Sequence, residues 1–145
     1  MTESEIQASA GLPSIGRRLA SMLYESLLLL GVLAATFLLP YLALGLAAGI
    51  VPPGPVLLVH VFVVLGAYYL WYWQRRGQTL AMQTWKLQLE SVGSGPPSLR
   101  QLALRYILAW PSVLFYGAGL LWALIDRDRQ FLHDRLAGTR IVFKR

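Results

Sequence analysis

Three long apolar stretches divide this chain, and polar residues gather between and after them. The stretches cover residues 19–39, 55–73 and 102–125, and each has roughly the 20 residues that cross a ~30 Å hydrocarbon core as a helix. Helices of soluble bundles carry polar stripes at a spacing of about 3.6 residues, which these stretches largely lack. The pattern therefore predicts an all-α membrane protein with three apolar segments and argues against the alternative, a soluble helical bundle.

Proline and glycine mark the places where these segments are expected to end or bend. Pro40 predicts an end or a kink after the first segment, and the Gly/Ala-rich residues 41–51 can prolong that helix at the far interface. The third segment contains Pro111, Gly117 and Gly119, and it is too short for two full spans. We therefore expect the third segment to be kinked or re-entrant and to be sheltered by other parts of the protein.

Two short stretches have the pattern of β-strands. Residues 86–90 alternate polar and apolar side chains with period two, and residues 139–143 are β-branched and aromatic. Neither strand is stable alone, but the two can pair into a cytoplasmic two-stranded ribbon if they lie on one side of the membrane. Each follows a polar stretch, 78–85 or 128–137, that is typical of a short interfacial helix. The alternative is that both stretches are interfacial loops.

The distribution of lysine and arginine predicts the orientation of the segments. Arg17 and Arg18 precede the first segment, residues 41–54 carry no charge, and further basic residues lie between the second and third segments. The positive-inside rule therefore predicts a cytoplasmic N-terminus. Three full spans would place the basic C-terminal tail outside, so we favour a bent third segment that keeps the tail inside. Residues 1–13 are expected to form a flexible tail and residues 14–145 a single membrane domain.

Composition excludes several classes of function. Charged residues make up 14 % of the chain, against roughly 25 % in soluble domains, and the net charge of +6 comes from basic clusters beside apolar segments. This charge fits attraction to anionic lipid headgroups better than nucleic-acid binding. There is no cysteine, and the sequence contains no phosphate-binding loop, metalloprotease motif or nucleophile elbow. We therefore expect no enzymatic activity, no metal and no cofactor.

Glu25 is the only ionisable side chain in the first apolar segment. A carboxylate in hydrocarbon costs about several kcal/mol unless it is protonated, paired or wetted. One interpretation is a proton- or ion-linked carboxylate. The other is a structural ion pair with Arg18, two helical turns earlier on the same face, or with Arg105, one turn inside the third segment. Arg18 is also placed to extend its charge to the interface as a snorkelling cation.

Further polar candidates lie elsewhere along the chain. His60 could relay protons, or it could hydrogen-bond to a neighbouring helix. Asp134 could cap a helix, pair with one of the two arginines or bind a cation, whereas the adjacent His133 diverges from it by about 100° on a helix. Residues 126–129 are interpreted as a solvated charge run, and the aromatic residues among 68–73 as a belt at the inner interface.

Five short motifs occur in order along residues 14–142. They are Gly16-Arg17-Arg18-Leu19-Ala20, the acid Glu25, Gly77-Gln78-Thr79-Leu80, Leu104-Arg105, and His133-Asp134-Arg135-Leu136-Ala137-Gly138-Thr139. Together they resemble the RDD family of prokaryotic membrane proteins, which is named for one arginine and two aspartates. By position, Arg18 matches the arginine, Glu25 the first aspartate and Asp134 the second.

The resemblance also shows departures from the family pattern. Glu25 is longer by one methylene than the aspartate it matches, Ala81 stands where many members have glycine, and Gln83 where many have a basic residue. A ligand contact made by that basic residue would therefore be in doubt in this chain.

The resemblance implies a multi-pass protein of the bacterial inner membrane, for whose family transport of ions or other ligands has been proposed. Arg18, Glu25 and Asp134 are then the main candidates for a buried charge cluster, with Arg105, His133 and His60 as secondary candidates. One hypothesis is a small transporter or transporter subunit, forming a homo-oligomer or acting with a membrane partner. The alternative is a membrane scaffold or accessory protein whose charges only hold its helices together.

Overall fold

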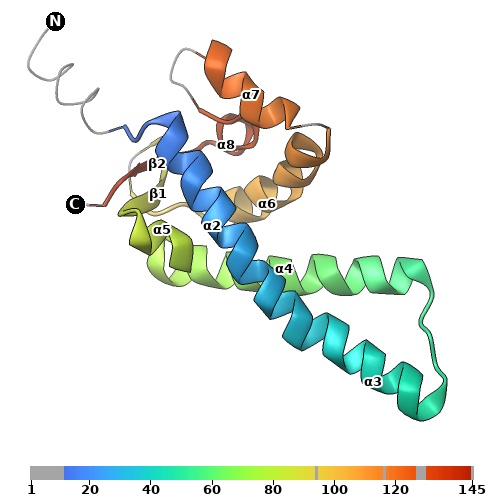
Figure 1. Cartoon of the computed structure of the whole chain (residues 1–145). Helices are drawn as coiled ribbons and strands as arrows, with labels where there is room; N and C mark the ends of the chain where they lie inside the picture. The colour runs from blue at the N-terminus through green and yellow to red at the C-terminus, as the bar shows by residue number, and fades with distance from the viewer. Residues whose placement is uncertain (1–11, 94, 116, 127–129, 145) are drawn as a thin grey trace, which may run out of the picture.

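The computed structural model describes residues 12–93, 95–115, 117–126 and 130–144. Most of the tail expected at residues 1–13 lies outside these ranges. The described chain is mostly helical, with one two-stranded sheet. Figure 1 shows two long helical rods that are joined at one end and carry a group of shorter elements at the other.

The first apolar segment forms a rod made of three consecutive helical pieces. They are α2 (Ile15–Leu33), the π-helix η1 (Ala34–Leu38) and α3 (Leu39–Ala48). Of the alternatives left open at Pro40, an end of the helix is not found, and the rod is prolonged through this residue as far as Ala48. The wide π-helical turn lies where the proline ring would otherwise crowd the carbonyl group four residues earlier, which is how the helix accommodates Pro40.

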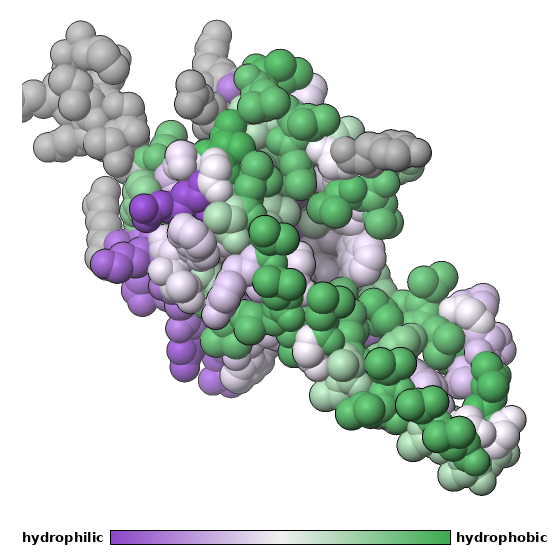
Figure 2. Space-filling model, viewed as in Figure 1, coloured by the Kyte–Doolittle hydropathy of each residue, from purple (hydrophilic) through white to green (hydrophobic). Residues whose placement is uncertain are grey.

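The second rod is α4 (Gly54–Arg76), which returns alongside the first after a short connection. Both rods are long and apolar enough to cross a membrane. Their large apolar side chains point outward, and Leu27 and Val63 keep 61 % and 59 % of their surface exposed. Figure 2 shows hydrophobic residues along the rods and hydrophilic residues near the group of shorter elements. Exposed apolar surface of this extent is rare on soluble proteins, whereas lipid covers it in a bilayer.

The third apolar segment is bent, as its glycines predicted. It forms α6 (Leu99–Leu114) and α7 (Ala118–Ile125), which meet at an angle of 96°. Pro111 lies inside α6, and the chain turns later, at Gly117, whose φ of 69° is in the left-handed region that favours glycine. A Cβ atom on Gly119 would clash with the side chain of Ser112, so the corner between the helices is closely packed.

The predicted ribbon is present. Strands β1 (Leu87–Ser91) and β2 (Thr139–Phe143) pair antiparallel, with Leu89 opposite Ile141. Along β1 the side chains of Leu87 and Leu89 are almost fully buried, and those of the alternating polar residues are more exposed. The period-two pattern therefore indicated both the strand and its buried face.

Short helices precede both strands, as expected from the polar stretches. They are α5 (Leu80–Thr84) before β1 and α8 (Leu132–Ala137) before β2; residues 128 and 129 of the second stretch lie outside the described ranges. The largest group of buried apolar residues lies where α4, α6 and the ribbon meet, and it contains Trp73, Met82, Leu87, Leu89, Leu102, Tyr106 and Ile141. This core attaches the short elements to α4 and leaves a cavity beside α2.

Candidate functional site

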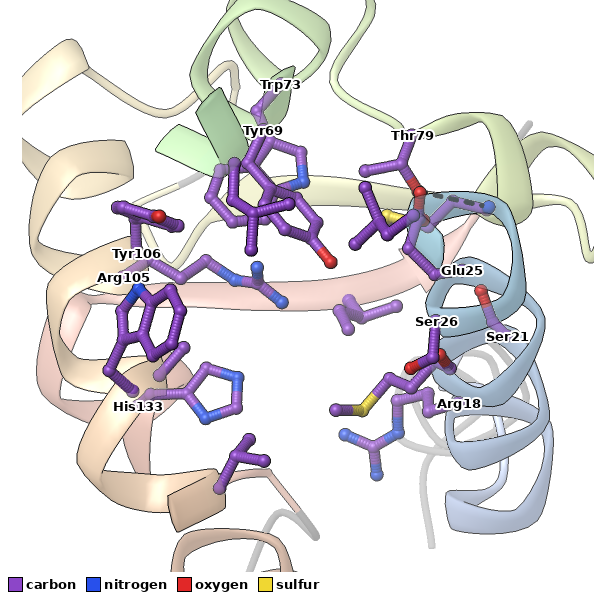
Figure 3. A pocket seen from close by; sticks show the side chains of 18 of the residues that line it. Arg18, Ser21, Glu25, Ser26, Tyr69, Trp73, Thr79, Arg105, Tyr106 and His133 are labelled. Atoms are coloured by element: carbon purple, nitrogen blue, oxygen red, sulfur yellow. Dashed lines mark hydrogen bonds between the residues drawn. The ribbon is translucent and has the colours of Figure 1, made fainter. Parts of the chain in front are cut away.

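A cavity of about 260 Å³ lies between α2, α4 and α6. Four of the candidate residues line it: Arg18, Glu25, Arg105 and His133. Figure 3 shows their side chains on facing sides of this space, with Arg18 and Glu25 on one side and Arg105 and His133 on the other. The fold thus brings together charged residues that are distant in sequence.

The inward face of α2 carries the first half of this cavity. Its buried residues are Arg18, Ser21, Glu25 and Leu29. Their spacing of three or four residues places them on one side of the helix. The remaining sides of α2 are apolar and largely exposed. The buried polar residues of this helix therefore face the cavity.

Glu25 is held by two hydroxyl groups. The Tyr68 hydroxyl donates to Glu25 Oε1 at 2.5 Å, and the Thr79 hydroxyl donates to Glu25 Oε2. Thr79 is also the N-cap of α5, and its oxygen accepts a hydrogen bond from the Met82 N–H at 3.3 Å. Glu25 forms no ion pair within the described part of the chain, so the structural alternative of a pair with an arginine is not found there.

Asp134 has the ion pair that Glu25 lacks. Arg105 Nε donates to Asp134 Oδ1 at 2.5 Å, and both side chains are buried. The Arg105 guanidinium also stacks over the ring of Trp73, with its Cζ atom 4.4 Å from the centroid. This pair joins α6 to α8, and Asp134 lies behind Arg105 rather than in the cavity wall.

Arg18 is buried in the wall of the same cavity. Its guanidinium lies 4.9 Å from the centroid of the Phe131 ring, and the negative charges of Asp134 and Asp126 attract it through space. Asp126 itself forms an ion pair with Arg135 at 3.2 Å, and its side chain is almost fully buried. The interpretation of residues 126–129 as a solvated charge run is therefore wrong for Asp126, and residues 127–129 lie outside the described ranges.

His133 is a buried neutral histidine. Its ring stacks on Phe131 with an interplanar angle of 20°, and only 3 % of its surface is exposed. Burial lowers the pKa of His133 to about 4, although the negative charge of Asp134 acts in the opposite direction. Its Nδ1 atom has no hydrogen-bond partner among the described residues.

His60 lies away from this cavity, in the part of α4 that packs against η1 and α3. Its Nδ1 atom is 3.0 Å from the hydroxyl of Tyr41, and Phe37 contacts both rings edge-on. The sequence left two interpretations of His60 open, a proton relay and a hydrogen bond to a neighbouring helix. The contact with Tyr41 of α3 agrees with the second. The described part of the chain contains no group of three or more His, Asp or Glu side chains arranged to hold a metal ion.

Sequence reasoning missed three residues that complete the surroundings of the candidates. Thr79 and Tyr68 hold Glu25, and Phe131 packs between Arg18 and His133. Thr79 lies in one of the motifs that carry the family resemblance, which was a signal for it. Tyr68 was grouped with the interfacial aromatic belt, and nothing in the sequence distinguished Phe131 from an ordinary core residue.

Comparisons with known proteins agree with the resemblance seen in the sequence. The family model described as RDD family matches residues 12–138. A protein of Rickettsia prowazekii (strain Madrid E), named "Uncharacterized protein RP437", is 27 % identical over 81 residues. This match covers 55 % of the chain and 44 % of the relative, so the chain spans less than half of that protein's length. No solved structure matches significantly.

The family match includes all three residues assigned by position to the family's arginine and acids, which are Arg18, Glu25 and Asp134. It also covers both spanning rods, the bent third segment and α8, and it ends just before β2. Since the match extends over most of the chain, the protein belongs to the RDD family.

Proposed function

We propose that this chain is a non-enzymatic, multi-pass protein of the bacterial inner membrane that acts as a small transporter or a transporter subunit. In this proposal Glu25 takes up and releases a proton or a cation inside the cavity. The distribution of lysine and arginine supports a cytoplasmic N-terminus and a cytoplasmic ribbon. A homo-oligomer or a membrane partner would complete the pathway, since two or three spans are too few to enclose one.

The observation that carries this proposal is the contrast between the two buried acids. Asp134 is fully buried and paired with Arg105, which is what a charge that only locks helices requires. Glu25 lines an open cavity, accepts hydrogen bonds from two neutral hydroxyl groups, and has no ion pair within the described residues. A carboxylate held in this way can exchange a proton or a cation without leaving an arginine unpaired.

A second candidate function has support from the Arg105–Asp134 pair. Because this pair joins α6 to α8, and α8 leads directly into β2, the charges also stabilise the ribbon. A membrane scaffold would use this ribbon to contact a partner or anionic lipid headgroups. The scaffold proposal assigns no exchange of ions to Glu25.

Glu25→Gln separates the two candidates. In proteoliposomes with a pH gradient and a series of monovalent cations, we expect this substitution to reduce flux to the level of empty liposomes. Glu25→Asp should retain part of the flux because it preserves the carboxylate. The matched control is Glu90→Gln, which removes a carboxylate from the ribbon, outside the cavity.

Flux that persists unchanged in Glu25→Gln across the pH range would contradict the transporter proposal. A variant that instead fails to fold or to assemble would favour the scaffold. Size-exclusion chromatography and thermal unfolding of the purified variants distinguish these results.

A further inference from the structure

The cavity has one polar end built around the guanidinium of Arg105. Its Nε atom is held by Asp134 and its plane by Trp73, so the orientation of the group is fixed from two sides. Among the described residues, the hydrogen bond that holds this group is made through Nε rather than through the terminal nitrogens Nη1 and Nη2. Figure 3 shows this end of the side chain pointing into the cavity. Two parallel N–H groups presented in this way match the oxygens of a phosphate or carboxylate.

His133 adds an unsatisfied ring nitrogen at the same end. The side chain is buried to more than nine tenths, its ring faces the cavity in Figure 3, and its Nδ1 atom has no partner in the described part of the chain. A buried polar atom without a partner costs about 1–3 kcal/mol, so such atoms are normally satisfied by a ligand or water. A neutral ring that carries its proton on Nδ1 would donate to an anion at this place.

One part of the cavity wall is apolar. Leu65, Trp110, Val113 and Leu114 contribute to it. Val113 and Leu114 keep 45 % and 69 % of their surface exposed, so this wall continues onto the outer surface of α6. An apolar chain bound along this wall could therefore extend from the cavity into the bilayer.

Charge and size limit the kind of ligand that fits. The described lining residues include two arginines and one acid, Glu25, whose oxygens are occupied by hydroxyl groups. Asp134 acts from behind Arg105. The two guanidinium groups in the lining suit a ligand that carries negatively charged oxygens. The volume of about 260 Å³ is below the ~300 Å³ at which small-molecule pockets usually begin, so it accommodates a headgroup and the first part of a chain.

We propose that this cavity binds an anionic glycerophospholipid, with the phosphodiester on Arg105, Arg18 and His133 and an acyl chain along the wall formed by Trp110, Val113 and Leu114. This inference rests on the proposed function in that it names the ligand class of the same cavity. The lipid is either the transported substrate or a resident ligand. Binding is measurable without transport, so the two proposals can fail separately.

The test uses the full chain in neutral detergent. Trp73 and Trp110 line the cavity, so tryptophan fluorescence can report its occupation. The protein is titrated with dihexanoyl phosphatidylglycerol, with dihexanoyl phosphatidylcholine and with inorganic phosphate. We expect phosphatidylglycerol to bind at least about tenfold more tightly than either of the others, because only it offers both a net negative charge and apolar chains.

Three variants sharpen the test. Arg105→Lys keeps the charge but removes the paired N–H groups, and it should weaken phosphatidylglycerol binding about tenfold. Ala109→Leu narrows the cavity without changing any charge, so it should weaken phosphatidylglycerol binding as well. The control Arg76→Gln removes an exposed arginine at the end of α4, outside the cavity, and should have no effect. Thermal unfolding verifies that each variant is folded.

Several results would overturn the inference. Equal binding of phosphatidylcholine would show that headgroup charge is not recognised, and equally tight binding of inorganic phosphate would indicate a site for free anions. If Arg76→Gln weakens phosphatidylglycerol binding as much as Arg105→Lys does, the lipid is attracted to surface charge rather than bound in the cavity. If cation flux is observed but phosphatidylglycerol does not bind more tightly than the other ligands, the lipid inference fails and the proposed function stands. Lipid binding without any Glu25-dependent flux would instead contradict only the transporter.

Discussion

Asp134→Ala is expected to destabilise the protein by about 3–5 kcal/mol, because it leaves the buried Arg105 guanidinium without its counter-ion. Arg105 is only 7 % exposed, and its guanidinium stacks on Trp73, so the group that loses its counter-ion stays largely buried. Loss of the pair also weakens the attachment of α8 to α6, and with it the ribbon. Chemical denaturation of the purified protein in detergent micelles, monitored by tryptophan fluorescence, measures the change in unfolding free energy.

A double substitution provides the internal control. Arg105→Met combined with Asp134→Leu removes both charges and should lose much less stability than Asp134→Ala alone. The half-exposed pair of Arg140 and Glu90, 3.5 Å apart on the ribbon, offers a second comparison. Glu90→Gln should cost at most about 1 kcal/mol. If Asp134→Ala costs no more than Glu90→Gln, the pair does not hold α6 and α8 together.

His133→Phe is expected to make the stability of the protein less sensitive to acid. In the unfolded chain this histidine has the ordinary pKa of 6.5, whereas burial lowers the pKa in the folded protein to about 4. Between these values only the unfolded chain binds the proton, so the folded state loses stability as the pH falls through this window. The contribution of His133 lost over the whole window is about 3 kcal/mol.

The measurement is the unfolding free energy of both proteins at intervals from pH 7 to pH 4. Carboxylates titrate in both proteins, so their effect largely cancels in the difference. Phenylalanine keeps the stacking on Phe131 and removes the titrating group. Parallel pH profiles for the wild type and the variant would contradict the assignment of His133 as a buried neutral residue.

The broad fold was predictable because it depends on local patterns. Apolar length indicated the two rods, period-two alternation indicated β1, and Gly117 supplied the left-handed turn in the third segment. Pro40 left the course of the helix open, because the usual effect of proline assumes a regular α-helix. A π-helical turn removes that conflict, and no local residue pattern specifies such a turn.

The candidate site was predictable in its members but not in its pairings. The family resemblance suggested a cluster of Arg18, Glu25 and Asp134, and depth in the membrane alone added Arg105 to it. The structure instead separates an ion pair, Arg105–Asp134, from a carboxylate held by hydroxyl groups. These pairings depend on how helices rotate about their axes and on which face of α4 turns inward. Several residues of the aromatic run were equally suited to an interfacial position.

Trp73 illustrates this limit. It was assigned to an interfacial belt, whereas it is 4 % exposed and stacks on the Arg105 guanidinium. Tyr69 from the same run lines the cavity, and Trp71 remains 55 % exposed. Helical periodicity separates these residues only once the position of α6 is known. That position depends on contacts between residues far apart in the chain, which one sequence does not specify.

The transporter proposal requires that water reach Glu25 in the cavity beside the spanning helix α2. The chain has no cysteine, so single cysteines introduced on this helix can be followed without background. Ser26→Cys lies in the cavity wall, and Leu27→Cys lies at nearly the same depth on the exposed apolar side. Both variants are reconstituted in liposomes and treated with a charged thiol reagent that does not cross lipid.

Because the reactive thiolate is costly to form in hydrocarbon, we expect Ser26→Cys to react at least about tenfold faster than Leu27→Cys. Equal rates at the two positions would contradict the transporter proposal, since Glu25 would then have no aqueous route for exchanging a proton or a cation.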